Sequence, residues 1–189
     1  MTGELRKISA ILIVLLAAVT FSVGFVDGGD GAAASELSRV HRTVAARYPN
    51  VAHVTTTQLA KSGGRHTLLF DVRERDEFAV SHLADAVRVS PDITERDFLA
   101  NYGDRVTGLR VVFYCSVGMR SSALAQRVQD VLIARGARSV RNLQGGLFQW
   151  RNERRRLTRN RSVTTAIHPY NTYWGRLIDD KTAIRYVPD

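Results

Sequence analysis

Short apolar runs alternate with helix-like stretches between residues 51 and 150, and this alternation limits the possible folds more than any other feature of the chain. The apolar runs are rich in Val, Leu and Phe, and the stretches between them space their apolar residues as helices do. Strands that alternate with helices require crossover connections, so they form a mostly parallel sheet with helices on both faces. We therefore expect an α/β domain.

The positions of the elements follow from apolar spacing and turn residues. The expected strands are 51–54, 67–70, 86–89, 109–114 and 139–143, and the expected helices are 56–60, 74–80, 92–101, 121–135 and 146–152. The helix over Ser121–Arg135 has the clearest apolar face and ends just before Gly136, a residue type that commonly terminates helices. An amphipathic helix over Ser35–Arg47, ending before Tyr48-Pro49, leads into this region.

The chain contains a single cysteine, Cys115, directly after the predicted strand 109–114. One cysteine excludes an intrachain disulfide and any zinc or iron–sulfur site built from several cysteines. In open α/β sheets, ligands bind beyond the carboxyl ends of the strands. Cys115 and Asp71, which both follow predicted strands, are therefore expected to face the same crevice.

The loop after Cys115 has the features that stabilise a thiolate. A tight loop that leads into a helix N-terminus points successive backbone N–H groups inward and forms an anion-binding nest, and Gly118 permits the necessary backbone angles. This nest and the nearby Arg120 would lower the pKa of the thiol and make it a nucleophile for sulfur or phosphoryl chemistry. The alternative is a cysteine buried as a small hydrophobic side chain.

The segment Cys-Ser-Val-Gly-Met-Arg-Ser, residues 115–121, resembles the C-x-x-G-x-R-S active-site loop of single-domain rhodaneses, which are sulfurtransferases. Other segments resemble further landmarks of that family, namely Leu68–Arg73 with Glu77-Phe78, His82-Leu83 with Ala86, and Leu143–Leu147 with Trp150. Ser81 and Asp85 depart from it, because they stand where the family usually has glycines. The resemblance covers about residues 51–150 and implies a rhodanese-like three-layer sandwich with a central sheet of about five strands.

The resemblance implies a sulfur-transfer cycle without metal or cofactor. Cys115 would attack a small anionic sulfur donor such as thiosulfate, become a persulfide, and pass the sulfur to a thiol or cyanide. The residues expected to bind the donor and the persulfide are Ser116, Val117, Gly118, Met119 and Arg120. Asp71 and Arg73 are expected to support the loop, Asp71 by accepting backbone N–H bonds and Arg73 by pairing with Glu77. His82 is expected to be a hydrogen-bonded core residue.

Two other functions remain open at this point. Related cysteine-dependent phosphatases and arsenate reductases use a C-x5-R loop to hold a tetrahedral anion, whereas the spacing from Cys115 to Arg120 is C-x4-R and favours sulfur transfer. Rhodanese-like domains also serve as non-catalytic binding modules, usually after loss of the cysteine. The presence of Cys115 argues against this last possibility.

An uncharged segment of nineteen residues, Ile8–Val26, follows Arg6 and Lys7 near the N-terminus. As an apolar helix it would be about 28 Å long, close to the ~30 Å hydrocarbon core of a bilayer. The basic residues before it favour a cytoplasmic N-terminus and an exported domain. Two outcomes stay open: a membrane anchor with the domain on the extracytoplasmic side, or a signal peptide cleaved after Ala34, which gives a periplasmic or secreted protein.

The formal net charge is +9, and Arg151–Arg161 contains six arginines. This run is expected to be a solvated linker, or alternatively a contact for anionic lipid headgroups, while an exported protein has no nucleic acid to bind. The aromatic segment His168–Trp174 is expected to pack on the domain or on a partner. The chain thus divides into residues 1–34 (signal peptide or anchor), 35–50 (lead-in helix), 51–152 (rhodanese-like domain) and 153–189 (basic and aromatic extension).

Overall fold

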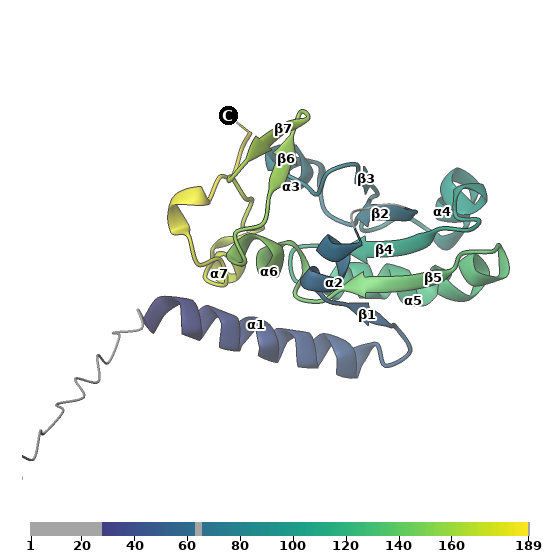
Figure 1. Ribbon diagram of the computed structural model, residues 1–189, viewed down its shortest axis with the longest axis horizontal. Coiled ribbons are helices and arrows are strands. Elements are labelled where there is room, and N and C mark those ends of the chain that lie inside the picture. The colour runs from purple at the N-terminus through teal and green to yellow at the C-terminus, as the bar shows by residue number, and fades with distance from the viewer. Residues whose placement is uncertain (1–27, 63–65, 189) are drawn as a thin grey trace, which may run out of the picture.

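Five parallel strands form the central sheet among the described residues, which confirms the predicted α/β fold (Figure 1). The computed structural model describes residues 28–62 and 66–188. Its strands are β1 (His53–Val54), β2 (Thr67–Asp71), β3 (Val87–Arg88), β4 (Arg110–Tyr114) and β5 (Ser139–Leu143), in the spatial order β1-β5-β4-β2-β3. The last residues of β2 and β4, Asp71 and Tyr114, are paired in register. The segments that follow these two strands therefore start at the same edge of the sheet.

Helices connect the strands and flank the sheet. They are α1 (Gly28–Arg47), α2 (Thr56–Lys61), α3 (Arg75–Val80), α4 (Glu95–Tyr102), α5 (Met119–Ala134), α6 (Gly146–Asn152) and α7 (Thr172–Gly175), with 3-10 turns at Gly103–Arg105 and Lys181–Ala183. α5 begins two residues earlier than expected, because Gly118 adopts a left-handed conformation with φ +99° and ends the preceding loop there. β1 is shorter than expected, because the N–H of Val51 bonds to the carbonyl of Tyr48 in the turn after α1.

The predicted apolar helix Ile8–Val26 lies outside the described residues. α1 begins at Gly28 rather than at Ser35, so that the backbone at Ala34 is helical. Over residues 28–62 and 66–188, no helix is both long enough and apolar enough to cross a membrane. Export and membrane anchoring stay predictions.

Alternate residues of β4 belong to two separate hydrophobic cores. Val111 and Phe113 pack with apolar side chains of α4 and α5 on one face of the sheet. Val112 and Tyr114 pack on the other face with side chains of α1, α2 and α6. Because successive side chains of a strand point to opposite faces, a strand covered on both sides has a continuous apolar sequence. The sheet and its two helical layers form the expected three-layer sandwich.

The C-terminal extension belongs to the core of the molecule. After α6 the chain forms an antiparallel hairpin, β6 (Leu157–Arg159) and β7 (Ser162–Thr164), and then continues to α7. Leu177 and Ile178 are fully buried in the same cluster as Leu37 of α1. The extension therefore packs back on the domain, as its aromatic composition indicated, and it lies beside α1 and α6 (Figure 1).

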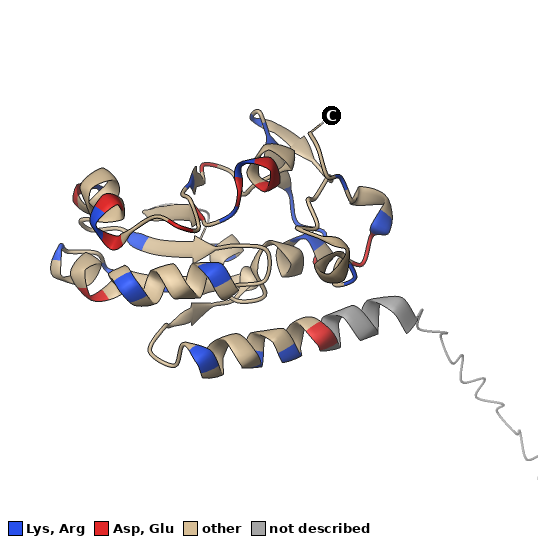
Figure 2. Ribbon diagram, turned by 180° about the vertical axis from the view of Figure 1, so that it is seen from behind, with Lys and Arg blue, Asp and Glu red and all other residues tan. Residues whose placement is uncertain are grey.

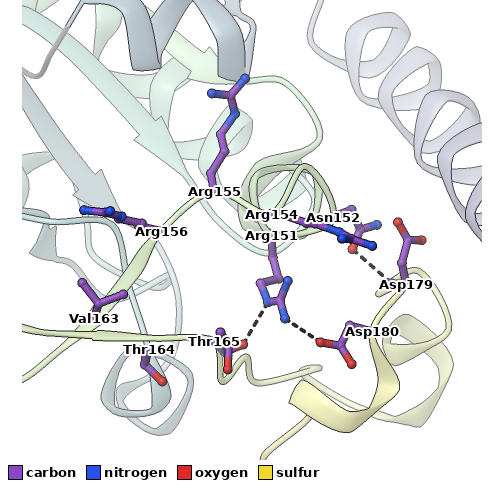
Figure 3. Close-up of a pocket in the computed structure, with 10 residues that line it drawn as sticks. All are labelled: Arg151, Asn152, Arg154, Arg155, Arg156, Val163, Thr164, Thr165, Asp179 and Asp180. Atoms are coloured by element: carbon purple, nitrogen blue, oxygen red, sulfur yellow. Dashed lines mark hydrogen bonds and ion pairs between the residues drawn. The ribbon is translucent and has the colours of Figure 1, made fainter.

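The basic run Arg151–Arg161 is folded rather than a linker, although three of its arginines, Arg154, Arg156 and Arg161, are exposed to solvent as expected. It starts in the last turn of α6 and continues into β6, and its first residue is buried. Arg151 donates from Nε to the carbonyl oxygen of Thr165 at 2.9 Å and from Nη2 to Oδ2 of Asp180 at 2.7 Å (Figure 3). Basic residues also lie along α1 and α5 (Figure 2). The run thus connects the domain to the extension, and its contact with lipid stays a prediction.

We expect Ile178→Ala to lower the free energy of unfolding by about 2–5 kcal/mol, because the residue is 0% exposed and its loss leaves a cavity. Val187→Ala is the matched control, since Val187 lies in the same extension but is 69% exposed, and it should change stability by less than about 0.5 kcal/mol. Urea unfolding of both variants measures the difference. Equal midpoints would show that the extension does not contribute to the core.

Candidate active site

Cys115 is the first residue after β4, and its thiol lies at the bottom of the loop that leads into α5. The residue is 1% exposed. The backbone N–H of Gly118 donates to its Sγ atom at 3.2 Å. This N–H can point at the sulfur because Gly118 takes the left-handed conformation that disfavours other residue types. The loop is therefore the inward-pointing nest that the sequence predicts.

The surroundings of Cys115 favour its thiolate form. Burial alone would raise the pKa of the thiol, but the positive charge of Arg120 and hydrogen bonds from Ser121 and from the Val117 N–H outweigh it and hold the pKa below its ordinary value. Stabilising a thiolate in this way is what makes a cysteine a nucleophile.

The start of α6 holds the cysteine loop through backbone hydrogen bonds. The N–H of Leu147 donates to the carbonyl of Cys115 at 2.9 Å, and the N–H of Phe148 donates to the carbonyl of Ser116 at 3.0 Å. Gly146, at φ +59°, lies so close that a Cβ atom there would be 2.4 Å from the carbonyl oxygen of Cys115. A residue without a side chain is therefore required at position 146 for this approach.

Glu77 of α3 pairs with Arg120 of α5 directly beside the cysteine loop. Arg120 donates from Nη1 to Oε2 at 2.7 Å and from Nη2 to Oε1 at 2.8 Å, and the hydroxyl of Ser116 donates to the same carboxylate at 2.8 Å. Burial alone would raise the pKa of Glu77, but the guanidinium of Arg120 holds it below its ordinary value. The charge that was expected to attract an anionic donor is thus balanced by a buried carboxylate.

Asp71 and Arg73 form a second, fully buried ion pair behind the loop. Arg73 donates from Nε to Oδ1 at 2.8 Å and from Nη2 to Oδ2 at 2.7 Å, and Nη2 also donates to the carbonyl of Ser81 at 2.6 Å. The predicted pairing of Arg73 with Glu77 is wrong, because Arg73 precedes α3 and turns inward instead of lying on its surface. Asp71 was expected to accept backbone N–H bonds, but its partner is the guanidinium of Arg73.

Tyr114 is also fully buried, whereas His82 is half-buried. The hydroxyl of Tyr114 accepts the N–H of Leu83 at 3.1 Å, and burial, together with the negative charge of Asp71, raises the pKa of Tyr114 well above its ordinary value. His82 stacks on Phe78 at 3.8 Å between ring centroids, and its Nδ1 lies 2.9 Å from the carbonyl of that residue. His82 is therefore hydrogen-bonded, as expected, but it is half-buried where a core position was expected.

A cavity of about 160 Å³ opens above the thiol. We call it the cysteine cavity; its lining residues are Cys115, Ser116, Val117, Met119, Arg120, Tyr170 and Trp174. Five of them come from the predicted loop. Gly118 does not line the cavity, but its N–H donates to the sulfur of Cys115. Asp71 and Arg73 do not line the cavity either. Sequence reasoning missed Tyr170 and Trp174, although the aromatic cluster of the extension was the signal that could have identified them.

Residues 55–153, more than half of the chain, match the family described as rhodanese-like domain. The chain belongs to the rhodanese-like domain family. A similar curated relative is the thiosulfate sulfurtransferase GlpE of Coxiella burnetii, which is 28% identical over 105 residues, covering 55% of this chain and 88% of the relative.

Two solved structures resemble this rhodanese-like protein. One is a thiosulfate sulfurtransferase from Pseudomonas aeruginosa, with 28% identity and a TM-score of 0.46, covering 58% of this chain and 20% of that one. The other is a Rhodopseudomonas palustris protein of unknown function described as a possible tyrosine phosphatase, with 22% identity and a TM-score of 0.44, covering 66% of this chain and 90% of that one.

The structure accounts for the two departures from the glycine pattern of rhodanese-like proteins. Asp85 has φ +60°, in the left-handed region where glycine is unstrained and where aspartate is tolerated better than most residues. Ser81 has an extended backbone with φ −170°, which any residue adopts. Neither residue lines the cysteine cavity, so the departures leave it intact.

A second cavity, of about 610 Å³, lies between the end of α6, the hairpin and the extension (Figure 3). Its walls include Arg154, Arg155 and Arg156 as well as Asp179 and Asp180. It shares no lining residue with the cysteine cavity and extends beyond the rhodanese-like match. In the described part of the chain, no three His, Cys, Asp or Glu side chains come together as a metal site requires.

We expect Asp71→Asn to lower the free energy of unfolding by about 3–5 kcal/mol, because it leaves the buried guanidinium of Arg73 without its counter-charge. Asp92→Asn, at an exposed position, is the control and should change stability by less than about 0.5 kcal/mol. Urea unfolding measures both. If the two variants unfold at the same denaturant concentration, the buried pair does not stabilise the fold.

The rate at which iodoacetamide alkylates Cys115 should rise with pH around a midpoint below the ordinary pKa of a cysteine, because only the thiolate reacts. Arg120→Gln removes the positive charge next to the sulfur and should move this midpoint to higher pH. Arg127→Gln, seven residues further along α5, should leave it unchanged. A midpoint that does not move in Arg120→Gln would contradict the role assigned to this charge.

Proposed function

We propose that the protein is a sulfurtransferase that carries sulfane sulfur as a persulfide on Cys115. The observation that carries this proposal is the contact between the thiol and its loop: the N–H of Gly118 donates to Sγ, and Arg120 helps to lower the pKa of the thiol. The same backbone dipoles can hold the negative charge of a persulfide. The names of relatives that are 28% identical support the same activity.

In the loading step, the Cys115 thiolate attacks the outer sulfur of a donor such as thiosulfate. The new bond joins Sγ to that sulfur, and the sulfur–sulfur bond of thiosulfate breaks with its electron pair leaving on sulfite. The enzyme keeps one extra sulfur atom as a persulfide, and no oxidant or metal takes part. A covalent intermediate of this kind gives ping-pong kinetics, because sulfite leaves before the acceptor binds.

In the second step, a thiophilic acceptor attacks the outer sulfur of the persulfide. The Cys115 sulfur then leaves with the electron pair of the broken bond and returns to the thiolate. Cyanide would leave as thiocyanate and a thiol as a hydropersulfide. The Cys115 thiolate is a good leaving group because the loop N–H and Arg120 stabilise its negative charge.

The charge of the loop argues against the phosphatase or arsenate reductase alternative. A guanidinium that binds a phosphate dianion does so through two parallel N–H bonds, but Arg120 already directs such a pair at Glu77, and its Nη2 also donates to the hydroxyl of Ser116. The short C-x4-R loop points in the same direction.

Intact-mass spectrometry of the purified full chain, before and after incubation with thiosulfate, tests this proposal. We expect a gain of one sulfur atom that cyanide removes, and no gain in Cys115→Ser. A reactive thiol that gains no sulfur would contradict the proposal and favour the phosphatase or arsenate chemistry. A thiol that neither gains sulfur nor reacts with iodoacetamide would instead indicate a binding module.

A further inference from the structure

The two walls of the cysteine cavity come from different parts of the chain. One wall is the loop itself, with Val117 and Met119 as its apolar members. The opposite wall consists of Tyr170 and Trp174, which lie in the C-terminal extension beyond the family match at residues 55–153. The extension thus adds two aromatic side chains to a site whose chemistry the family loop already provides.

Tyr170 is fixed against the loop by its backbone and by its ring. Its φ of +66° is in the left-handed region, which is uncommon for a bulky residue and persists where the surroundings determine it. Its N–H donates to Nδ1 of the buried His168 at 3.0 Å, and its ring lies 4.7 Å from the guanidinium carbon of Arg120. The side chain remains 46% exposed, so that one part of the ring faces the solvent side of the cavity.

Trp174 is positioned by α7 and by the core. Oδ1 of Asn171 accepts the N–H of Trp174 at 3.0 Å and caps the helix, and the indole packs on the core cluster that contains Tyr114 and Leu147. The indole therefore forms a rigid wall. Ile178 and Leu177, a few residues further along, anchor the same segment in the core.

The charge and size of the cavity indicate what it can hold besides sulfur. The guanidinium of Arg120 is paired with Glu77 and covered by the ring of Tyr170, so much of its charge is already balanced before an acceptor binds. The remaining walls are mainly apolar or aromatic. An apolar cavity of about 150 Å³ accepts a benzene-sized molecule, and the cysteine cavity has about 160 Å³.

We propose that Tyr170 and Trp174 bind the sulfur acceptor, and that this acceptor is a small organic thiol with an uncharged, apolar body. This inference rests on the proposed sulfur transfer. The acceptor enters as the thiol, its proton passes to the outer sulfur of the Cys115 persulfide, and the acceptor thiolate then forms a bond to that sulfur. The sulfur–sulfur bond of the persulfide breaks, its electron pair returns to Cys115 as the thiolate, and the acceptor leaves as the protonated hydropersulfide.

The test uses the full chain loaded with thiosulfate and three acceptors: phenylmethanethiol, 2-mercaptoethanol and cyanide. The two thiols have similar acidity but differ in the apolar body. We expect the persulfide to react faster with phenylmethanethiol than with 2-mercaptoethanol. Trp174→Ala and Tyr170→Ala should each reduce this preference, by about tenfold for Trp174→Ala, because the lost aromatic contact stabilises only the apolar acceptor.

Matched variants separate this role from a general effect on the fold. Tyr173→Ala is the control, because Tyr173 is a 60% exposed aromatic residue of the same helix that does not line the cavity, and its variant should keep the preference. Tyr170→Phe retains the ring and should keep it as well. The readout in every variant is the ratio of the rates with the two thiols, because a change in the reactivity of the persulfide itself alters both rates alike. Tyr173→Ala should also keep the wild-type rate with cyanide, which verifies that the persulfide site is intact.

The outcomes distinguish this inference from the function on which it rests. Failure of the wild-type chain to form a persulfide, or to release sulfur to cyanide, would overturn the sulfurtransferase proposal. A normal cyanide reaction without a preference for phenylmethanethiol would overturn only the assignment of the acceptor. So would a preference that Tyr170→Ala and Trp174→Ala leave unchanged, or that Tyr173→Ala reduces to the same extent.

Discussion

The backbone of the cysteine loop is held by the first turn of α6, and much of the site depends on this contact. Two N–H groups at the start of α6 bond to the carbonyls of Cys115 and Ser116, and the approach is possible only because Gly146 has no side chain. The same helix ends at Arg151, whose guanidinium binds the extension through Thr165 and Asp180. One short helix thus fixes the loop at its first turn and the extension at its last.

Two ion pairs lie side by side near the loop but have different consequences. The pair of Asp71 and Arg73 is fully buried and does not line the cysteine cavity, so it contributes to the stability of the fold. The pair of Glu77 and Arg120 reaches the cavity, because Arg120 lines it and is partly exposed. Its carboxylate limits the net charge that a substrate meets, while the guanidinium still favours the thiolate. Charge balance and thiol activation are therefore set by the same contact.

The sequence was most informative where local patterns decide the structure. β5 and α6 match the predicted ranges 139–143 and 146–152, since the glycine pair 145–146 marks the boundary between them. The loop from Cys115 to Arg120 could be placed because strand, glycine and helix follow one another directly. The partners of the charged residues could not be predicted in this way. Glu77 and Arg73 stand at a helical spacing, but the true partner of Glu77 is 43 residues away in the sequence.

Tyr170 and Trp174 were equally hidden, because a wall between distant segments leaves no periodic pattern. Only the tertiary path of the extension brings them to Cys115, which precedes Tyr170 by more than fifty residues. This arrangement divides the work of the site between two parts of the chain. The loop handles charge through backbone N–H groups and one guanidinium, which are indifferent to the body of a substrate. In the proposed reaction, selectivity for the acceptor therefore comes from the side chains that line the cavity, above all from the aromatic rings of Tyr170 and Trp174.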